Sequence, residues 1–462
     1  MTKYDAIIVG SGQAATPLAR KLAANGWKTA VIERQWVGGT CVNVGCTPTK
    51  TMIASGRVAY LVKRSADFGI KTTGFGVDVE TFLRRKNSVV LAAREANTKG
   101  LLNTPNLDLI FGIAAFTGAK EITVTKEDGS PETMTAGHIF LNTGAHPFIP
   151  PIPGLAAIPY LTSTSILDLH ELPSHLAIIG GGYVALEFGQ LYRRLGSQVT
   201  IIENGDRFLP KEDDDIAAEL RRILEEDGIR ILTGTSVLAV TRGDSIRLEL
   251  KRQMPEGRQQ DPAIEVSHVL VASGRRPDTA GLNTSAAGIR LDGHGYISVN
   301  GRLETSVPGI FALGDVKGGP QFTHVSWNDH LIVYKNLIEK ANLSIEDRVP
   351  VYCLFTDPEL GRVGLTENEA RAKGLNIKVA TMPAGYVARA GENGETRGLL
   401  KVIVNADDRR ILGAAMLISG GGELMSIVQM AMTGGVTYDK VRDGMYAHPT
   451  FAESLNNLFA KL

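Results

Sequence analysis

One sequence layout occurs twice in this chain of 462 residues, and it constrains the fold more than any other feature. Each copy has a short apolar run, the pattern G-x-G-x-x-A, a helix-like segment and a second apolar run that ends in a glutamate. The first copy begins with YDAIIVGSGQAA (4–15) and ends at Glu33; the second begins with HLAIIGGGYVA (175–185) and ends at Glu203. In both copies the glutamate lies 23 residues after the first glycine. The whole layout, in order and twice, is far more specific than the glycine pattern alone.

This layout is typical of a parallel βαβ unit that binds the pyrophosphate of a dinucleotide. The first glycine permits a tight turn, the second lets the backbone approach the phosphates, and the alanine lets the helix pack close to its strand. The helix N-terminus attracts the phosphates, and the glutamate accepts a hydrogen bond from a ribose hydroxyl. The alternative is that the glycines only shape turns. We therefore expect an α/β fold with two dinucleotide sites, formed by Gly10, Gly12, Ala15 and Glu33 in the first copy and by Gly180, Gly182, Ala185 and Glu203 in the second.

A pair of cysteines lies in GGTCVNVGCTPTK (38–50), although the chain has only three cysteines in all. Cys41 and Cys46 have Gly45 between them, so their Cα atoms can come within the roughly 4.4–6.8 Å that a disulfide needs. Closing so small a ring adds little stability, which argues against a structural disulfide. A structural zinc site needs four ligands, and no second Cys or Cys/His pair completes one. The pair is therefore predicted to be redox-active, whereas Cys353, in the apolar run VYCLF, is expected to be a buried strand residue.

The composition argues against several classes of partner. Lys plus Arg and Asp plus Glu both number 49, so no net charge favours nucleic acid or an anionic membrane. No apolar run reaches membrane-spanning length, and the N-terminal MTKYDAIIVG lacks the features of a signal peptide. We therefore expect a cytoplasmic protein, in a compartment where paired cysteines tend to be catalytic or metal-binding.

With the cysteine pair added, the chain resembles the FAD-dependent pyridine nucleotide–disulfide oxidoreductases over essentially its whole length. This family includes glutathione reductase, dihydrolipoamide dehydrogenase and mercuric reductase. GGTCVNVGC-x-P-x-K is similar to the redox-centre motif of the family. LNTGAHPFIPPIPG (141–154) and VASGRRPD (271–278) resemble the family's crossing between domains and its return. TSVPGIFALGD (305–315) resembles the second flavin motif, and YAHPTFAESL (446–455) resembles the C-terminal His-Pro-Thr motif.

The resemblance implies FAD at the first dinucleotide site, a nicotinamide nucleotide at the second, and a disulfide stacked against the flavin. By resemblance, Cys46 is the flavin-proximal thiol and Cys41 is the interchange thiol that meets substrate. Lys50 would lie near the flavin, paired with Glu187, and Tyr183 matches an aromatic gate over the nicotinamide pocket. Asp315, the last residue of the second flavin motif, matches an aspartate that binds the ribityl chain of the flavin. This aspartate and the other implied cofactor contacts are Thr40, Ala114, Gly144, Gly274, Arg275, Asp315 and Thr323.

NADH is the expected nucleotide in preference to NADPH. Glu203 ends the second strand of its unit, where NADPH-using relatives carry an arginine. A carboxylate accepts a hydrogen bond from a 2′-hydroxyl and repels a 2′-phosphate. Arg207, four residues further on, would soften this preference.

The C-terminal motif carries a histidine and a glutamate with two compatible interpretations. Thr450 and Glu453 form T-x-x-E, a capping box that predicts the start of the last helix and a structural role for Glu453. The functional interpretation is that Glu453 orients His448, which protonates the leaving thiol or stabilises a thiolate. In the family this histidine reaches the cysteines of the other subunit, so the resemblance implies a homodimer with shared active sites.

Within the family, the chain looks closest to the branch of mercuric reductase and the reactive-chlorine-resistance flavoprotein, through GCTPTKTMIASG, QFTHVSWNDHLIV and FTDPELGRVGLTE. It ends NNLFAKL, without the vicinal cysteines of mercuric reductase, which argues against mercuric ion as its natural acceptor. The expected function is an NAD(P)H-dependent reductase that passes electrons to a small disulfide or metal ion. Two alternatives stay open: an NAD(P)H oxidase or diaphorase that does not need the cysteines, and a redox-sensing protein whose disulfide state controls a partner.

The same motifs predict three domains. Residues 1–147 and 272–345 are expected to form the FAD-binding domain, and 148–271 the NAD(P)-binding domain. Strand-like runs such as KVIVNA and ILGAAML, followed by helices, predict an α+β dimerisation domain over 346–462.

Overall fold

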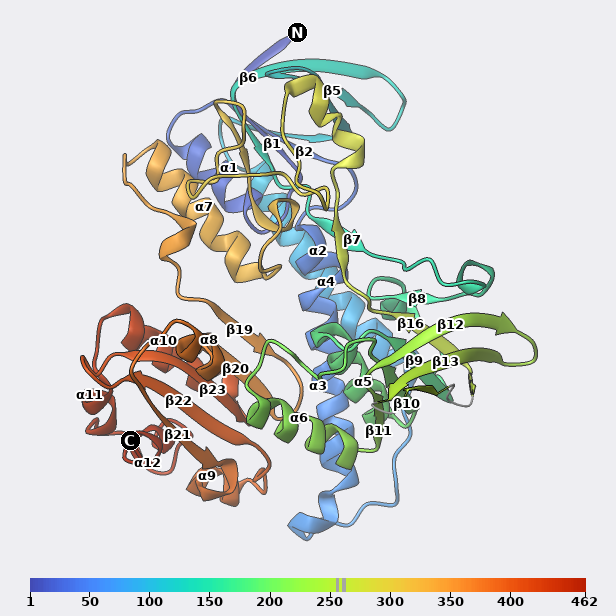
Figure 1. Ribbon diagram of the computed structural model, residues 1–462. Coiled ribbons are helices and arrows are strands. Elements are labelled where there is room, and N and C mark those ends of the chain that lie inside the picture. The colour runs from blue at the N-terminus through green and yellow to red at the C-terminus, as the bar shows by residue number, and fades with distance from the viewer. Residues whose placement is uncertain (255–256, 260–262) are drawn as a thin grey trace.

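Three groups of helices and strands, each with a sheet of its own, make up this computed structural model, which describes residues 1–254, 257–259 and 263–462. In Figure 1 the N-terminal sheet lies at the top, the middle group at the lower right and the C-terminal group at the lower left, and helices α3 and α4 of the N-terminal group run down between the other two groups. Within the described residues, no helix combines the length and the apolar character needed to cross a lipid bilayer.

The N-terminal sheet contains the first predicted βαβ unit. Its strands are β1 (Thr2–Val9), β2 (Thr29–Glu33), β3 (Leu107–Phe111), β4 (Ile113–Gly118), β5 (Glu121–Thr125), β6 (Pro131–Leu141) and β18 (Ile310–Ala312). The strand order is β3-β2-β1-β6-β5-β4, and β18 also pairs with β6. Neighbours among β1, β2, β3, β6 and β18 are parallel, whereas β4 and β5 fold back as antiparallel strands. The helices of this group are α1 (Ala15–Ala24), α2 (Gly39–Val44), α3 (Cys46–Lys63), α4 (Val79–Leu102) and α7 (Thr323–Leu337).

The middle sheet contains the second predicted unit, again as strand, helix and parallel strand. Its strands run in the order β11-β10-β9-β16-β8 and are all parallel to their neighbours. They are β8 (Leu161–Thr162), β9 (His175–Ile179), β10 (Gln198–Ile202), β11 (Ile229–Leu232) and β16 (His268–Val271), with helices α5 (Tyr183–Leu195) and α6 (Asp214–Glu226). A separate antiparallel sheet packs beside it, made of β12 (Thr235–Arg242), β13 (Ile246–Met254), β14 (Gly257–Gln259) and β15 (Ile264–Val266).

The two stretches expected to cross between domains pair with each other. β7 (Ala145–Pro147) and β17 (Arg275–Pro277) form an antiparallel two-stranded ribbon. The segment by which the chain leaves the N-terminal sheet therefore lies beside the segment by which it returns. β18 then pairs with β6 of the first sheet, after the strands of the middle sheet are complete.

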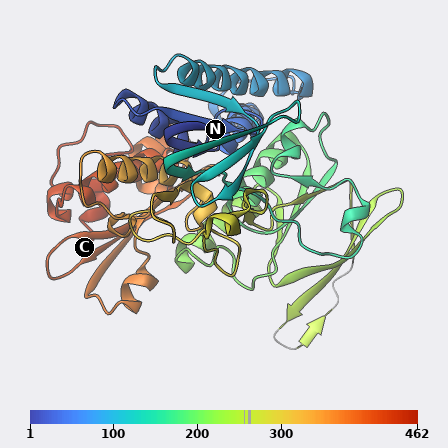
Figure 2. The same ribbon diagram turned by 90° about the horizontal axis from the view of Figure 1, so that it is seen from above.

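The C-terminal group is an antiparallel sheet in the order β19-β20-β23-β22-β21, with helices around it. The strands are β19 (Val351–Leu354), β20 (Glu359–Gly364), β21 (Ile377–Pro383), β22 (Leu399–Asn405) and β23 (Ile411–Ile418). The helices are α8 (Glu367–Ala372), α9 (Ala388–Glu392), α10 (Gly421–Thr433), α11 (Tyr438–Arg442) and α12 (Ser454–Phe459). Figure 2 shows this group (orange to red) and the antiparallel β12–β14 sheet at opposite ends of the molecule.

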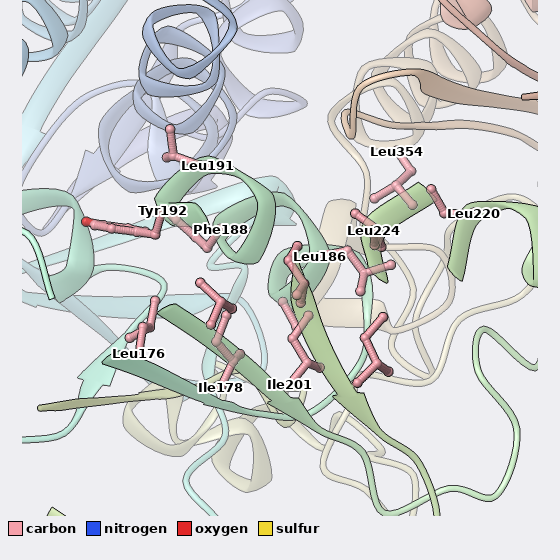
Figure 3. Close-up of a cluster of buried hydrophobic side chains, with 14 of the residues drawn as sticks. Leu176, Ile178, Leu186, Phe188, Leu191, Tyr192, Ile201, Leu220, Leu224 and Leu354 are labelled. Atoms are coloured by element: carbon pink, nitrogen blue, oxygen red, sulfur yellow. The ribbon is translucent and has the colours of Figure 1, made fainter. Parts of the chain in front are cut away.

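One hydrophobic cluster spans the three groups and fixes the position of α3. It includes Met52 of α3, Leu191 of α5, Leu224 of α6 and Leu354 of β19. Figure 3 shows Leu354 beside Leu224 above the middle sheet. α3 and α5 approach closely: a Cβ on Gly56 would lie 2.8 Å from a methyl carbon of Leu191. Because each fully buried side chain of this kind contributes about 1.5–3 kcal/mol, this packing holds the start of α3 in place.

Candidate active site

The first glycine loop leaves the N-terminus of α1 open to a ligand. Gly10 has φ +90°, and a Cβ there would lie 2.4 Å from the carbonyl oxygen of Asn142, so the position requires glycine. A Cβ on Gly12 would lie 2.7 Å from Asn142 Oδ1, a buried atom that accepts no hydrogen bond from the described residues. No side chain in the described part of the chain caps the first turn of α1, which begins at Ala15. Its free N–H groups and positive dipole end suit a pyrophosphate.

Glu33 lies buried at the end of β2 and organises the same loop. Ser11 donates two hydrogen bonds to Glu33 Oε2, from its N–H at 3.1 Å and from its hydroxyl at 2.6 Å. The N–H of Gln35 donates to Oε1 at 2.9 Å. Glu33, the predicted acceptor for a ribose hydroxyl, thus also holds the loop through its hydrogen bonds with Ser11. The sequence had not pointed to Ser11.

The second glycine loop opens into a cavity of about 600 Å³. Gly180 has φ +108°. Apart from its chain neighbours, no described residue has an atom within 4 Å of a Cβ placed on Gly182, so a ligand can approach the backbone there. Glu203 accepts hydrogen bonds from the N–H groups of Gly181 (2.6 Å) and Gly205 (2.7 Å). The volume falls in the range of roughly 300–1,000 Å³ that is usual for cofactor sites.

Four predicted nucleotide contacts lie together around this cavity. Tyr183, Glu203, Gly274 and Arg275 all line it. α5 begins at Tyr183, and none of the described side chains caps its N-terminus. The residues of the second glycine layout therefore fit a dinucleotide in the same way as those of the first.

The two cysteines lie at the break between α2 and α3. A Cβ on Gly45 would lie 2.8 Å from the carbonyl oxygen of Thr40, so the close approach of the backbone at this break depends on a glycine. Cys41 and Cys46 are both free thiols. Cys46 Sγ lies 3.3 Å from Thr323 Oγ1, at the start of α7.

The two cysteines differ in the pKa of their thiols. A hydrogen bond from the Cys41 thiol, together with Thr323 and the Lys50 ammonium, lowers the pKa of Cys46 to about 6. The same hydrogen bond, together with burial, raises the pKa of Cys41. The two shifts favour a thiolate at Cys46 and a protonated thiol at Cys41.

Lys50 and Glu187 form the predicted ion pair, with 2.6 Å between Nζ and Oε2. The Glu187 side chain is only 3% exposed, and its other oxygen accepts the N–H of Phe355 at 3.1 Å. Lys50 Nζ also lies 4.8 Å from the centre of the Phe355 ring. Helices α3 and α5 and the C-terminal group thus meet one helical turn beyond Cys46.

The remaining predicted cofactor residues lie in loops and at strand ends around these two sites. Ala114 is buried in β4. Gly144 (φ +78°) and Gly274 (φ +109°) adopt the left-handed region beside the crossing ribbon. The guanidinium of Arg275 donates to the carbonyl oxygen of Ala145. Asp315 lies in a short turn, where burial raises the pKa of its carboxyl against the opposing effect of Arg275.

His448 and Glu453 contact each other but not the cysteines within one chain. His448 Nδ1 lies 2.9 Å from Glu453 Oε2, and His448 is exposed. The motif precedes α12 in the C-terminal group, away from α2 and α3 (Figure 1). The capping-box prediction is wrong in part. Thr450 Oγ1 accepts the Glu453 N–H at 3.2 Å, but the Glu453 carboxylate is taken by His448, and α12 begins only at Ser454.

The structure adds an aromatic cluster that the sequence analysis missed. The ring centres of Tyr183 and Phe322 are 5.7 Å apart, and those of Phe322 and Tyr352 are 5.6 Å apart. The only local signal is that Phe322 directly precedes Thr323, the partner of Cys46. Cys353 is a strand residue as predicted, but it is only partly buried. The described residues contain no group of three or more His, Cys, Asp or Glu side chains placed to hold a metal ion.

Known families account for nearly the whole chain. Residues 4–329 match the family described as pyridine nucleotide-disulphide oxidoreductase, and residues 350–459 match the dimerisation domain of the same family. Only residues 1–3, 330–349 and 460–462 lie outside these matches.

Curated relatives and solved structures agree with this assignment. The probable pyridine nucleotide-disulfide oxidoreductase RclA of Escherichia coli (strain K12) is 39% identical, over 100% of this chain and 99% of that one. A mercuric reductase of Staphylococcus aureus is 36% identical, over 98% of this chain and 81% of that one. The solved Cu(II) complex of the HOCl-induced flavoprotein disulfide reductase RclA from Escherichia coli has a TM-score of 0.90 and 38% sequence identity, and the match covers 100% of this chain and 99% of that one.

Proposed function

The chain belongs to the pyridine nucleotide-disulphide oxidoreductase family, and from that premise we propose that it passes electrons from NAD(P)H through FAD and the Cys41–Cys46 pair to a small disulfide or a metal ion. FAD occupies the first glycine site in this proposal and the nicotinamide nucleotide the second. Bound FAD supplies the two-electron carrier between nicotinamide and sulfur. The proposal places the enzyme in the cytoplasm, where thiols are kept reduced.

The observation that carries this proposal is the surroundings of Cys46, whose Sγ lies 3.3 Å from Thr323 Oγ1 and beside the Cys41 thiol and the Lys50 ammonium. Two electrons break the sulfur–sulfur bond of the oxidised pair and leave a thiolate at Cys46 and, after uptake of one proton, a thiol at Cys41. The lowered pKa of Cys46 and the raised pKa of Cys41 favour this distribution. Thr323 and Lys50 stabilise the Cys46 thiolate, so Cys41 is the thiol available to an acceptor.

The proposal assigns His448 to the acceptor side of the pair in a homodimer. Nδ1 of His448 bonds to Glu453, so Nε2 is the ring nitrogen left to exchange a proton with sulfur. His448 is exposed and lies apart from the cysteines of its own chain, and the C-terminal part of the chain matches a dimerisation domain. A second copy of the chain would bring its His448 to Cys41, where it takes the thiol proton and returns it to the leaving thiol.

The proposed nucleotide is NADH. Glu203 lines the cavity, and its carboxylate is fixed by two backbone N–H groups, in a place where a 2′-phosphate would meet negative charge. Arg207, the one nearby cation considered as a phosphate ligand, is instead paired with Asp214. This pairing supports the proposal, because it turns the guanidinium towards Asp214.

The acceptor is proposed as a thiophilic metal ion or a small disulfide. The solved structure of one relative is described as a Cu(II) complex of an HOCl-induced flavoprotein disulfide reductase, and another relative is a mercuric reductase. A partly buried thiol next to a thiolate suits either acceptor once the thiol has lost its proton, because both acceptors react with thiolate sulfur.

The test is anaerobic reduction of the FAD-loaded enzyme by NADH, followed by a panel of acceptors: Cu(II), Hg(II), glutathione disulfide, lipoamide, quinones and oxygen. The proposal predicts turnover with at least one metal ion or disulfide, and its loss in Cys41→Ser. Full turnover in Cys41→Ser would support an oxidase or diaphorase instead. Absence of turnover with every acceptor in the wild-type enzyme would support a redox sensor.

A further inference from the structure

We infer that Phe322 is a positioning residue that holds Tyr183 between the nucleotide cavity and the thiols, and so sets how readily the cavity admits the nicotinamide ring. The inference rests on the proposed function, because it concerns access of NAD(P)H to the site. It adds a residue outside the glycine layouts and the cysteine motif.

Tyr183 stands between the cavity and the Lys50–Glu187 pair. It lines the cavity and is the first residue of α5, whereas Glu187, one turn later on the same helix face, bonds to Lys50. The Tyr183 side chain is 38% exposed, and its hydroxyl makes no hydrogen bond with the described residues. Its position therefore depends on how its ring packs.

Phe322 is the aromatic partner that packs against Tyr183. The two ring centres are 5.7 Å apart, with 41° between the ring planes, a tilted arrangement within the usual range for aromatic pairs. Gln321, the preceding residue, lines the cavity, and Thr323, the following residue, contacts Cys46. In the chain, Phe322 thus lies between a residue that lines the cavity and a residue that contacts a thiol.

Phe322 itself is held firmly from the other sides. Its ring is nearly parallel to that of Tyr352 (5.6 Å, 4°) and to that of His324 (5.4 Å, 11°). The Nε2–H of His324 donates to the carbonyl oxygen of Val351 at 2.7 Å, which ties α7 to β19. Two rings on separate elements therefore fix the orientation of Phe322.

Tyr352 is anchored in turn to the middle group. Its hydroxyl donates to Glu212, a carboxylate that is 4% exposed and lies just before α6. Arg362 of β20 lies 4.0 Å from the other oxygen of Glu212. The row Tyr183–Phe322–Tyr352–Glu212 thus begins and ends in the nucleotide-binding group and passes through α7 and β19. Phe322 thus packs against three rings, of which Tyr183 is the one that lines the cavity.

This arrangement has a consequence for nucleotide affinity. A nicotinamide ring that reaches the thiol side of the cavity must displace the Tyr183 ring from Phe322. The apparent affinity is then reduced by the fraction of molecules in which Tyr183 has moved aside. Loss of one aromatic contact shifts such an equilibrium by about threefold to tenfold.

The test compares the binding of NAD⁺ and of ADP-ribose to the oxidised, FAD-loaded enzyme by calorimetry. ADP-ribose lacks the nicotinamide ring and so does not need Tyr183 to move. Phe322→Leu removes the aromatic ring but keeps apolar bulk. We expect it to lower the Kd of NAD⁺ by about threefold to tenfold and to leave the Kd of ADP-ribose unchanged. Reoxidation of the pre-reduced variant by oxygen should also be faster.

Two control variants separate positioning from a general disturbance. Trp327→Leu changes an exposed aromatic residue of α7, the helix that begins directly after Phe322, and the ring of Trp327 contacts His330 instead. Phe322→Tyr keeps the supporting ring. Both should match the wild-type enzyme in the NAD⁺ to ADP-ribose affinity ratio. An unchanged ratio in Phe322→Leu, or an equal change in Trp327→Leu, overturns the inference.

If Phe322→Leu does not fold, Tyr352→Leu removes the second ring of the row and is expected to change the ratio in the same direction. An unchanged ratio in that variant also overturns the inference. If the wild-type enzyme binds NAD⁺ but reduces no acceptor, the proposed function is contradicted. The inference about Phe322 is tested separately, because the ratio of NAD⁺ and ADP-ribose affinities does not depend on turnover.

Discussion

Lys50 Nζ lies 2.6 Å from Glu187 Oε2, and this ion pair joins the helix that begins at Cys46 to the helix that begins at Tyr183. The two residues are 137 positions apart in the chain. One helix carries the thiols, and the other starts at the rim of the nucleotide cavity. The pair therefore fixes the thiol site relative to the nucleotide site, and it does so close to Cys46, whose thiolate the Lys50 ammonium stabilises.

Glu187→Ala should destabilise this junction. The change leaves the Lys50 ammonium and the Phe355 N–H without their acceptor, and losing a charged hydrogen-bond partner costs about 1.5–3 kcal/mol. We expect a lower thermal midpoint and slower reduction by NADH, with Glu187→Gln between the alanine variant and wild type. Thermal unfolding of the FAD-loaded enzyme, followed by flavin fluorescence, measures the first effect, and stopped-flow absorbance measures the second. A midpoint in Glu187→Ala equal to that of wild type contradicts this account.

Cys41→Ser should show a long-wavelength absorption band without any reductant. Cys46 is then permanently free, and its thiolate can donate charge to the adjacent flavin. Because the thiolate predominates only above its pKa, the band should fade as the pH falls through the pKa of Cys46 in this variant. Thr323 and Lys50 still lower that pKa, whereas the hydrogen bond from the Cys41 thiol is lost. Cys46→Ser should lack the band, and His448→Ala, once reduced, should need a higher pH to develop it. No band in Cys41→Ser at any accessible pH would place Cys46 away from the flavin.

The ratio of kcat/KM values for NADH and NADPH should favour NADH, because the Glu203 carboxylate repels a 2′-phosphate. Glu203→Arg should shift this ratio towards NADPH. Steady-state kinetics with both nucleotides and one acceptor measures the ratio in each protein. The charge-neutral control is Glu203→Gln, which should fall between them. A wild-type preference for NADPH refutes the assignment.

Mixing inactive Cys46→Ser and His448→Ala chains should restore activity if subunits exchange. In a mixed dimer, one of the two sites would combine an intact cysteine pair with an intact histidine from the other chain. Native mass spectrometry establishes that mixed dimers form, and an acceptor assay measures the recovered rate. Mixed dimers without recovered activity would argue for a site within one chain.

Several features of the fold could be predicted because their signals are local. Gly10 and Gly180 both adopt positive φ at the turn after a strand, as the two glycine layouts require. Each layout forms strand, helix and parallel strand, and Glu33 and Glu203 stand at matching strand ends. The periodic apolar runs of β19, β22 and β23 were also visible, since residues of one strand carry their own pattern.

Other features had no local signal or a misleading one. β20 was missed because glycines interrupt ELGRVG, yet Gly361 is required there: a Cβ on it would lie 2.3 Å from the carbonyl oxygen of Gly421 in α10. The pattern Thr450-x-x-Glu453 predicted a full capping box. His448 competes successfully for the same carboxylate, so only half of the box forms.

The sequence by itself determined the two dinucleotide units, the cysteine pair and the family, because spacing within a short stretch of backbone dictates turn geometry and the reach of neighbouring side chains. Only the tertiary structure decided which distant groups act on that pair. Thr323 meets Cys46 across 277 positions, Glu187 meets Lys50, and Phe322 supports Tyr183. These contacts follow from how α3, α5 and β19 pack around a shared hydrophobic cluster and from how His324 of α7 bonds to Val351 of β19, and a packing arrangement is a property of all its members together. No local pattern specifies it.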